Sequence, residues 1–122
     1  MTDSFYFDSY ALIELILGNK NYEPYIGKGI IITKLNVFEV FYSFIRTGDE
    51  KTATYALNNL INFVVDFDAD TIQQAAKLRL MRKKDNLSMA DCIGYVTARK
   101  HEINFLTGDI QFKDMPNVEF VK

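Results

Sequence analysis

The sequence predicts an α/β fold in which helices cover both faces of a mainly parallel sheet of four to five strands. Short apolar runs, typical of buried strands, alternate along the chain with longer segments that have the apolar spacing of helices. This alternation indicates a parallel sheet, because parallel neighbours are joined by crossover helices. No repeat, linker or low-complexity stretch interrupts the order, so we expect residues 1–122 to form one domain.

The first half of the chain carries start and stop signals for its elements. Either residue of Asp8-Ser9 can cap a helix that Gly18 ends, and Thr33 can cap the next long helix. The β-branched run 30–32 is a strong strand signal. The predicted elements are a strand at 5–7, a helix through 11–17, a short helix or turn at 21–27, a strand at 30–32, and helices at 33–47 and 49–62.

The second half continues the alternation. Residues 63–67 are apolar apart from Asp66 and predict a third strand. Asp68 or Asp70 can start a long helix, and Ser88 can start the helix that precedes the next strand. The predicted elements are a strand at 63–67, helices at 68–84 and 88–100, and strands at 103–106 and 118–121, with breaks at 85–86 and 116–117.

Composition and charge narrow the classes of function. The net charge of −2 means that contact with nucleic acid needs a local basic patch. Cys92 is the only cysteine, which excludes an internal disulfide and predicts an intracellular, cytoplasmic location; we expect it to be a small core residue. His101 is the only histidine, which argues against a multi-histidine zinc site. Residues 1–4 do not resemble a secretory signal, and no run of about 18 apolar residues predicts a membrane span.

Four acidic residues stand where apolar residues are expected. Asp8 and Asp109 end apolar strands, and Glu39 and Asp91 lie inside apolar helical runs. Parallel strands all end at the same edge of a sheet, so Asp8 and Asp109 belong at that edge. Glu39 is in the second turn of a helix that leaves this edge, and Asp91 is in the first turn of a helix that must begin near it. We therefore expect the four carboxylates to converge.

Converging carboxylates repel one another, so such a cluster either has raised pKa values or holds a cation. Oxygen ligands without histidine suit Mg²⁺ or Mn²⁺ rather than Zn²⁺. A hard cation held by carboxylates and open to solvent is suited to phosphate chemistry.

Each acid also has a purely structural interpretation. Asp8 can be a helix N-cap, Asp109 a turn residue, and Asp91 the fourth residue of a capping box that begins at Ser88. For Asp91 taken alone, capping is the favoured interpretation.

Glu39 has the weakest structural alternative. It shares a helix face with Leu35 and Tyr42 that we expect to be buried, where no cap is needed, although a buried Arg or Lys could pair with it. Taken together, the four positions favour a shared site.

Two other charged segments need an interpretation. Asp66, Asp68 and Asp70 follow a predicted strand, and we interpret them as helix caps that match the helix dipole. Residues 77–84 form the densest basic stretch, which either contacts a nucleic-acid backbone or is a solvated helix end. The candidate RNA contacts in it are Arg79, Arg82, Lys83 and Lys84.

The order of these acids along a chain of this size resembles a PIN domain, and in size the VapC toxins of toxin–antitoxin pairs in particular. The resemblance covers nearly the whole chain. It implies a three-layer α/β fold and a Mg²⁺- or Mn²⁺-dependent ribonuclease, with metal and catalytic roles for Asp8, Glu39, Asp91 and Asp109. Ser9 and Thr107 match the hydroxyl residues that accompany the first and last acids. The resemblance also implies a homodimer, an RNA substrate and an inhibitory antitoxin.

One position departs from the family pattern. Many relatives carry a further acid two residues after the last one, where this chain has Gln111. This departure bears on a second metal ion and leaves the four-acid set intact.

Two other classes of phosphate-handling protein are disfavoured by the sequence. A haloacid-dehalogenase-like phosphoryl transferase needs a second Asp at the position of Tyr10, and a receiver domain needs a Lys after the strand at 103–106, where none occurs before Lys113. Two alternatives stay open: a PIN-like module that binds RNA or protein without cutting, and an RNA-processing PIN nuclease that has no antitoxin.

Overall fold

A computed structural model describes residues 3–122 and contains a four-stranded, fully parallel sheet. Met1 and Thr2, part of the segment in which no secretory signal is predicted, lie outside the described residues. The strands are β1 (Ser4–Phe7), β2 (Gly29–Ile31), β3 (Asn104–Thr107) and β4 (Val118–Phe120), in the order β2-β1-β3-β4. Tyr6 on the central strand lies opposite Ile31 on one side and Phe105 on the other. The predicted α/β class with a parallel sheet is confirmed.

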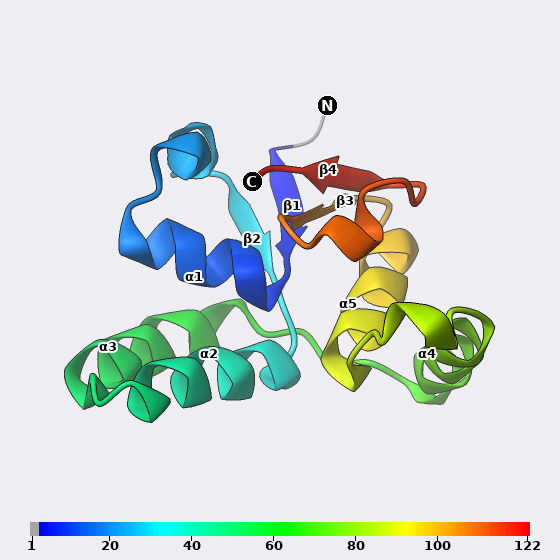
Figure 1. Cartoon of the computed structure of the whole chain (residues 1–122), viewed down its shortest axis with the longest axis horizontal. Helices are drawn as coiled ribbons and strands as arrows, with labels where there is room; N and C mark the ends of the chain where they lie inside the picture. Colours follow the sequence, from blue (N-terminus) through cyan, green and yellow to red (C-terminus); the bar gives the residue numbers. More distant parts are fainter. Residues whose placement is uncertain (1–2) are drawn as a thin grey trace.

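Five α-helices and four short 3₁₀ turns connect the described strands (Figure 1). Side chains or glycine cap the helices where the sequence predicts it: Asp8 caps α1, Gly18 ends it in a left-handed conformation, and Ser88 caps α5. The helices are α1 (Ser9–Leu17), α2 (Lys34–Arg46), α3 (Glu50–Leu60), α4 (Ala69–Met81) and α5 (Met89–Lys100), and the 3₁₀ turns are η1 (Lys20–Tyr25), η2 (Ile61–Phe63), η3 (Lys83–Asp85) and η4 (Ile110–Phe112).

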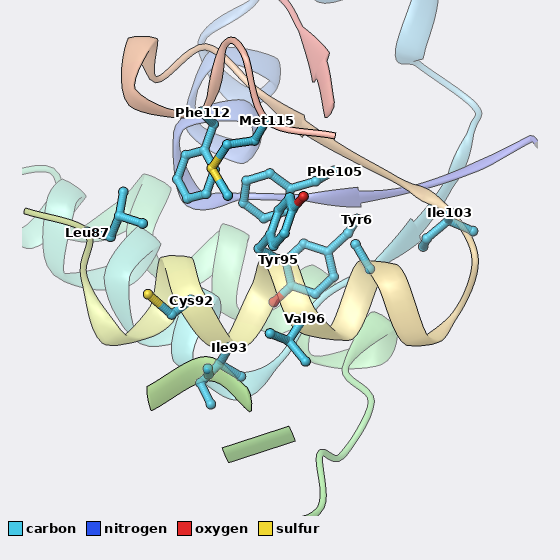
Figure 2. Close-up of a cluster of buried hydrophobic side chains, with 12 residues drawn as sticks. Tyr6, Leu87, Cys92, Ile93, Tyr95, Val96, Ile103, Phe105, Phe112 and Met115 are labelled. Carbon is cyan, nitrogen blue, oxygen red and sulfur yellow. The ribbon is translucent and has the colours of Figure 1, made fainter. Parts of the chain in front are cut away.

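The helices form one layer on each face of the sheet, because successive strand residues point to opposite faces. Phe7 and Leu106 pack with α1, α2 and α3, whereas Tyr6 and Phe105 pack with α4 and α5. Figure 2 shows the second of these clusters, in which Tyr6 and Phe105 lie against the side of α5. This helix approaches the sheet closely at Gly94, where an added Cβ would stand 2.7 Å from the Tyr6 ring. The result is a three-layer α/β architecture.

The layers bring the starts of α1, α2 and α5 toward the carboxyl ends of the strands, near the middle of Figure 1. This arrangement places Asp8, Glu39, Asp91 and Asp109 on elements that meet at one edge of the sheet, as the topology argument predicts. Within the described residues, no helix is both long and apolar enough to cross a membrane.

The predicted strand at 63–67 is wrong. Residues 61–63 form the 3₁₀ turn η2 directly after α3, and the sheet contact is a single parallel bridge between Ile32 and Val64. The Phe63 carbonyl accepts the Ile32 N–H at 3.3 Å, and the Val65 N–H donates to the Ile32 carbonyl at 2.8 Å. The apolar pattern resembles a strand because this segment runs beside the sheet edge, yet Phe63 is 41% exposed. The sheet therefore has four strands, at the lower end of the predicted range.

Two further expectations change in detail. The helix predicted at 68–84 ends at Met81, because residues 83–85 tighten into η3 and Asn86 then takes a left-handed conformation (φ 55°). The α2 face that carries Glu39 is only partly buried, since Tyr42 is 52% exposed. The buried face of α2 is instead formed by Asn36, Val37, Val40 and Phe44.

Candidate metal centre

Asp8 is the most buried of the four acids, at 2% exposure. Its Oδ1 accepts the Ala11 N–H at 2.8 Å and so caps α1, and its Oδ2 accepts the hydroxyl of Thr107. Burial raises the pKa of Asp8 to about 7, opposed by these two hydrogen bonds and assisted by the negative charges of Asp91 and Asp109. The capping interpretation of Asp8 is confirmed.

Thr107 links the first acid to the last. While its hydroxyl donates to Asp8, its Oγ1 accepts the Asp109 N–H at 3.0 Å. The half-buried Asp109 turns its Oδ1 to the N–H of Gln111 at 3.0 Å, which matches the predicted turn role. Gly108 lies between them at a crowded point, where an added Cβ would stand 2.5 Å from the Val121 carbonyl oxygen. Close packing at this glycine holds the Thr107–Asp109 turn against Tyr10 of α1 and Val121 after β4.

Glu39 is held by the hydroxyl next to Asp8. The Ser9 Oγ donates to Glu39 Oε1 at 2.5 Å. The carboxylate is half-buried, and burial is the main cause that raises its pKa; the charge of Asp91 adds to the shift. In the described part of the chain no Arg or Lys forms an ion pair with Glu39, so the alternative of a buried partner is not supported.

Asn36 belongs to this site and is missing from the sequence prediction. It is 1% exposed, its Nδ2 donates to Ser9 Oγ at 3.1 Å, and its Oδ1 accepts the hydroxyl of Tyr6. Asn36 thereby orients the serine that holds Glu39. A signal exists in the sequence, because Asn36 precedes the apolar residues Val40 and Phe44 by four and eight positions on the buried helix face.

Asp91 has its predicted capping role, which does not exclude the predicted role as a metal ligand. It completes a capping box, since its Oδ2 accepts the Ser88 N–H at 2.9 Å and its own N–H donates to Ser88 Oγ at 3.0 Å. Burial also raises the pKa of Asp91, and the charge of Asp109 raises it further. A helix cap uses one carboxylate oxygen and leaves the other free to bind a ligand, so the two roles are compatible.

The four carboxylates thus lie close enough to repel one another, and none of them forms an ion pair within residues 3–122. In the same part of the chain, however, no three Asp, Glu, His or Cys side chains form a ready-made metal shell. The donor set contains only oxygen and carries uncompensated charge. These properties fit a hard divalent cation that would draw the carboxylates together.

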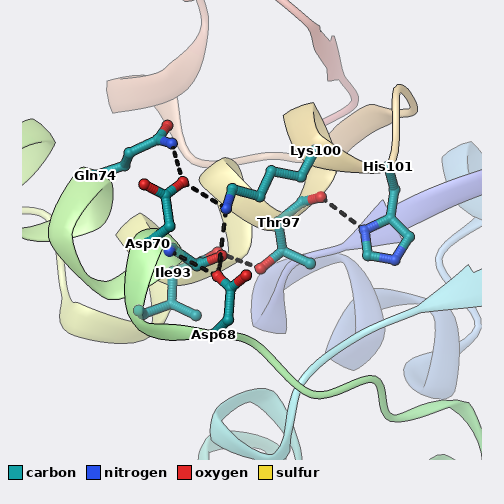
Figure 3. A network of polar contacts seen from close by, with 8 residues as sticks. Asp68, Asp70, Gln74, Ile93, Thr97, Lys100 and His101 are labelled. Atoms are coloured by element: carbon teal, nitrogen blue, oxygen red, sulfur yellow. Dashed lines mark hydrogen bonds and ion pairs between the residues drawn. The ribbon is translucent and has the colours of Figure 1, made fainter.

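Two acids of the second predicted group, Asp68 and Asp70, have the structural role that the sequence predicts (Figure 3), whereas Asp66 is exposed and is not the cap of α4. Asp68 caps α4 by accepting the Thr71 N–H at 2.9 Å. Lys100 lies 3.3 Å from Asp68 and 2.7 Å from Asp70, so this pair has its own cation. The hydrogen bonds to Thr71 are the main cause that lowers the pKa of Asp68 to about 2, and the bond to Lys100 adds to the shift.

The predicted basic residues lie at the end of α4 and in η3. Arg82 pairs with Asp85 at 2.9 Å, while Lys83 and Lys84 are exposed. Together with Arg99, these three residues line an open surface cavity of about 850 Å³ to which none of the four acids contributes. Arg79 lines a neighbouring, mainly apolar cavity. The structure brings the basic residues together but does not join them to the acids.

Comparisons with known proteins agree with this architecture. The family model for the PIN domain matches residues 5–118. No curated protein matches the chain significantly. Among solved structures, the fold is similar to a chain of a toxin–antitoxin complex from Klebsiella pneumoniae, with a TM-score of 0.71, 22% identity and coverage of 94% of this chain and 95% of that one. It is also similar to a chain of VapBC2 from Rickettsia felis bound to a promoter DNA fragment, with a TM-score of 0.70, 18% identity and coverage of 98% and 99%.

At these identities the structural likeness concerns the fold, whereas the family match extends over most of the sequence. The four-stranded parallel sheet and the edge at which the acids meet are consistent with that match. The chain belongs to the PIN domain family.

Proposed function

We propose that this protein is a Mg²⁺- or Mn²⁺-dependent endoribonuclease of the VapC type. The observation that carries the proposal is the group of four carboxylates that repel one another at one edge of the sheet. Within residues 3–122 none of them forms an ion pair, and the buried Asp8 has a pKa of about 7. Membership of the PIN family and the likeness to chains of toxin–antitoxin complexes support it.

The residues of the site have distinct proposed tasks. Asp8, Glu39, Asp91 and Asp109 would hold the cation, which when bound supplies charge neutralisation at the phosphate and a more acidic water. Thr107 orients Asp8 and Ser9 orients Glu39, so each hydroxyl fixes the carboxylate that it contacts. Because Asp8 has a pKa near neutrality, uptake of a cation at neutral pH would release a proton from this group.

Gln111 stands at the position where many relatives have a further acid. Its side chain is exposed, and its N–H donates to Asp109. We therefore propose that the four-acid set is the main cation site, with fewer ligands available for a second ion than in those relatives.

The substrate and partners follow from the same proposal. Phosphates of the RNA would meet the cations around the end of α4, namely the exposed Arg79, Lys83 and Lys84 and the half-buried Arg82. We also propose an inhibitory antitoxin, because the similar chains come from toxin–antitoxin complexes. A homodimer follows from the resemblance to VapC toxins, and a cytoplasmic location from the single cysteine. The apolar cavity of about 570 Å³ beside Leu35 and Met89, next to the acid-bearing helices, fits a protein partner.

A ribonuclease assay on structured RNA tests the function. We expect cutting with Mn²⁺ or Mg²⁺ that EDTA abolishes and that Asp8→Asn or Asp91→Asn reduces by about 10²-fold or more. Asp70→Asn is the matched control, because it removes an acid of the cation-paired group. Equal cutting by the wild type and both site variants would contradict the proposal.

A second candidate function is a PIN module that binds RNA or protein without cutting. It is favoured by one observation: within residues 3–122, Asp8, Asp91 and Asp109 serve as helix or turn caps, and the acids do not form a ready-made metal shell. A well-folded wild type that binds RNA and shows no cutting with either metal would support this module. An active enzyme that has no antitoxin would instead fit an RNA-processing PIN nuclease.

A further inference from the structure

Helix α2 carries a row of exposed side chains in which two aromatic rings lie between two cations. The row consists of Lys34, Phe38, Tyr42 and Arg46, spaced four residues apart along one ridge of the helix. Phe38 is 69% exposed and Tyr42 is 52% exposed. Within residues 3–122, neither Lys34 nor Arg46 forms an ion pair. We call these four residues the aromatic–basic row.

The row does not contribute to the core of the protein. The buried residues of α2 are Asn36, Val37, Val40 and Phe44, and they lie on another face of the helix. The two exposed rings instead stack on each other, with centroids 6.2 Å apart and planes within 6° of parallel. Each ring therefore keeps one face that the other ring does not cover, and bases of single-stranded nucleic acids stack on exposed aromatic faces of this kind.

The row lies beside the candidate metal centre. Glu39 directly follows Phe38 and precedes Tyr42 by three residues, and its carboxylate turns to Ser9. The same helix thus presents an acid of the site on one side and the aromatic rings on the adjacent side. A chain of nucleotides with one phosphate at the carboxylates would have neighbouring nucleotides along this ridge.

We propose that the aromatic–basic row binds single-stranded RNA, with bases stacked on Phe38 and Tyr42 and phosphates near Lys34 and Arg46. This inference rests on the proposed function, because it assumes that RNA is the substrate of the site. Charge complementarity supports RNA as the occupant: the row has a cation at each end, and Glu39 is the only acid on α2. The protein as a whole is acidic, so such a local pair of cations matters for the approach of a polyanion.

The test measures binding of a short fluorescein-labelled oligouridylate by anisotropy in EDTA, which prevents metal-dependent cutting. Phe38→Ala combined with Tyr42→Ala should weaken binding by about tenfold or more, because each stack is lost. Tyr55→Ala is the matched control: its ring is 66% exposed on α3, outside the row, and its affinity should equal that of the wild type.

Two further arms separate stacking from charge. An oligonucleotide with abasic sites lacks the bases that would stack, so it should bind the wild type weakly. Its affinity should match that of the intact oligonucleotide for the double aromatic variant. This variant should bind the intact and the abasic oligonucleotide equally. Lys34→Ala combined with Arg46→Ala should make the negative slope of log affinity against log salt shallower by roughly 1.4, as expected for two lost phosphate contacts on a single strand. Lys51→Ala on α3 serves as the charge control.

The outcomes distinguish this inference from the proposed function. If the aromatic variant binds RNA as tightly as Tyr55→Ala while the wild type cuts RNA with metal, the row is wrong and the function stands. If the row variants lose affinity but the wild type does not cut, the function is wrong and the row stands. Unchanged affinity with a fall from dimer to monomer in sedimentation would identify the row as an interface between copies and overturn the inference.

Discussion

The two acidic groups of this protein differ in whether the chain itself supplies a cation. Asp68 and Asp70 are exposed and share Lys100, and hydrogen bonds with Thr71 and then with this lysine keep the pKa of Asp68 low. The acids of the candidate metal centre are buried or half-buried, form no ion pair within residues 3–122, and repel one another, so the pKa of Asp8 is high. Carboxylates that a lysine of the same chain neutralises can stabilise a helix start. Carboxylates without such a lysine are suited to bind a cation from solution.

Cutting of RNA should show the largest difference between the groups. We expect Asp91→Asn to reduce metal-dependent cutting by about 10²-fold or more, because it removes a proposed ligand whose free oxygen the capping box does not use. The Asn side chain can still accept the Ser88 N–H, so the fold should survive. Asp70→Asn should cut at nearly the wild-type rate. Similar losses of cutting in Asp91→Asn and Asp70→Asn would show that the two acidic groups do not differ in function.

The pH dependence of stability should separate the groups next. The folded pKa of Asp8 is about 7 and its ordinary value is 3.8, so the folded state keeps a proton that the unfolded state has released. The free energy of unfolding should therefore fall as pH rises from about 4 to 7, by at most about 4 kcal/mol from this group.

Urea unfolding at a series of pH values measures this effect. Asp8→Asn has no such group, so its stability relative to the wild type should rise with pH over the same window. A difference between the two proteins that stays constant with pH would contradict the raised pKa of Asp8.

Hydroxyl positioning should give a smaller effect. Ser9→Ala removes the donor to Glu39, and we expect a loss of cutting of about tenfold at neutral pH, with a shift of the pH profile because the pKa of Glu39 rises further. Ser4→Ala, at the far end of β1, provides a control for loss of a serine hydroxyl. An unchanged pH profile in Ser9→Ala would show that Ser9 does not tune Glu39.

The cation-paired group should give the smallest effect. Lys100→Met removes the lysine from exposed ion pairs, which contribute little to stability in water. We expect a melting temperature close to that of the wild type and unchanged cutting. Because the pKa of Asp68 is lowered to about 2, any stability that this group contributes is present above its ordinary pKa of 3.8 and is lost as pH falls toward 2. Loss of cutting in Lys100→Met would mean that the two groups are coupled.

The sequence predicts the fold well where local and tertiary signals agree. Examples are the helix caps at Asp8 and Ser88 and the buried strands around Tyr6 and Phe105. Helix caps favour a few polar residue types, and strands buried on both faces consist of apolar runs, so both can be recognised in the sequence. The segment 63–67 is mispredicted because its apolar pattern does not reveal that only Val64 pairs with the sheet. Pairing of an edge segment depends on its neighbours in space rather than on its own residues.

The candidate site is predicted only in part for a similar reason. The positions of Asp8 and Asp109 follow from the shared edge of parallel strands. The links through Asn36 and the hydroxyl of Tyr6 do not, because a tyrosine in a strand is read as an apolar residue and its hydroxyl partner lies 30 residues away in sequence. Contacts between distant segments that satisfy buried polar groups require the tertiary structure.

Titration calorimetry with Mn²⁺ tests the central claim most directly, since it measures whether the acid cluster takes up a cation. At neutral pH we expect the wild type to bind Mn²⁺ with release of a proton, measured in two buffers of different ionisation enthalpy. Asp8→Asn should bind more weakly and release less, while Asp70→Asn should behave as the wild type. Absence of Mn²⁺ binding by the folded wild type, or equal binding in all three proteins, would contradict the proposal that these four carboxylates form a metal centre.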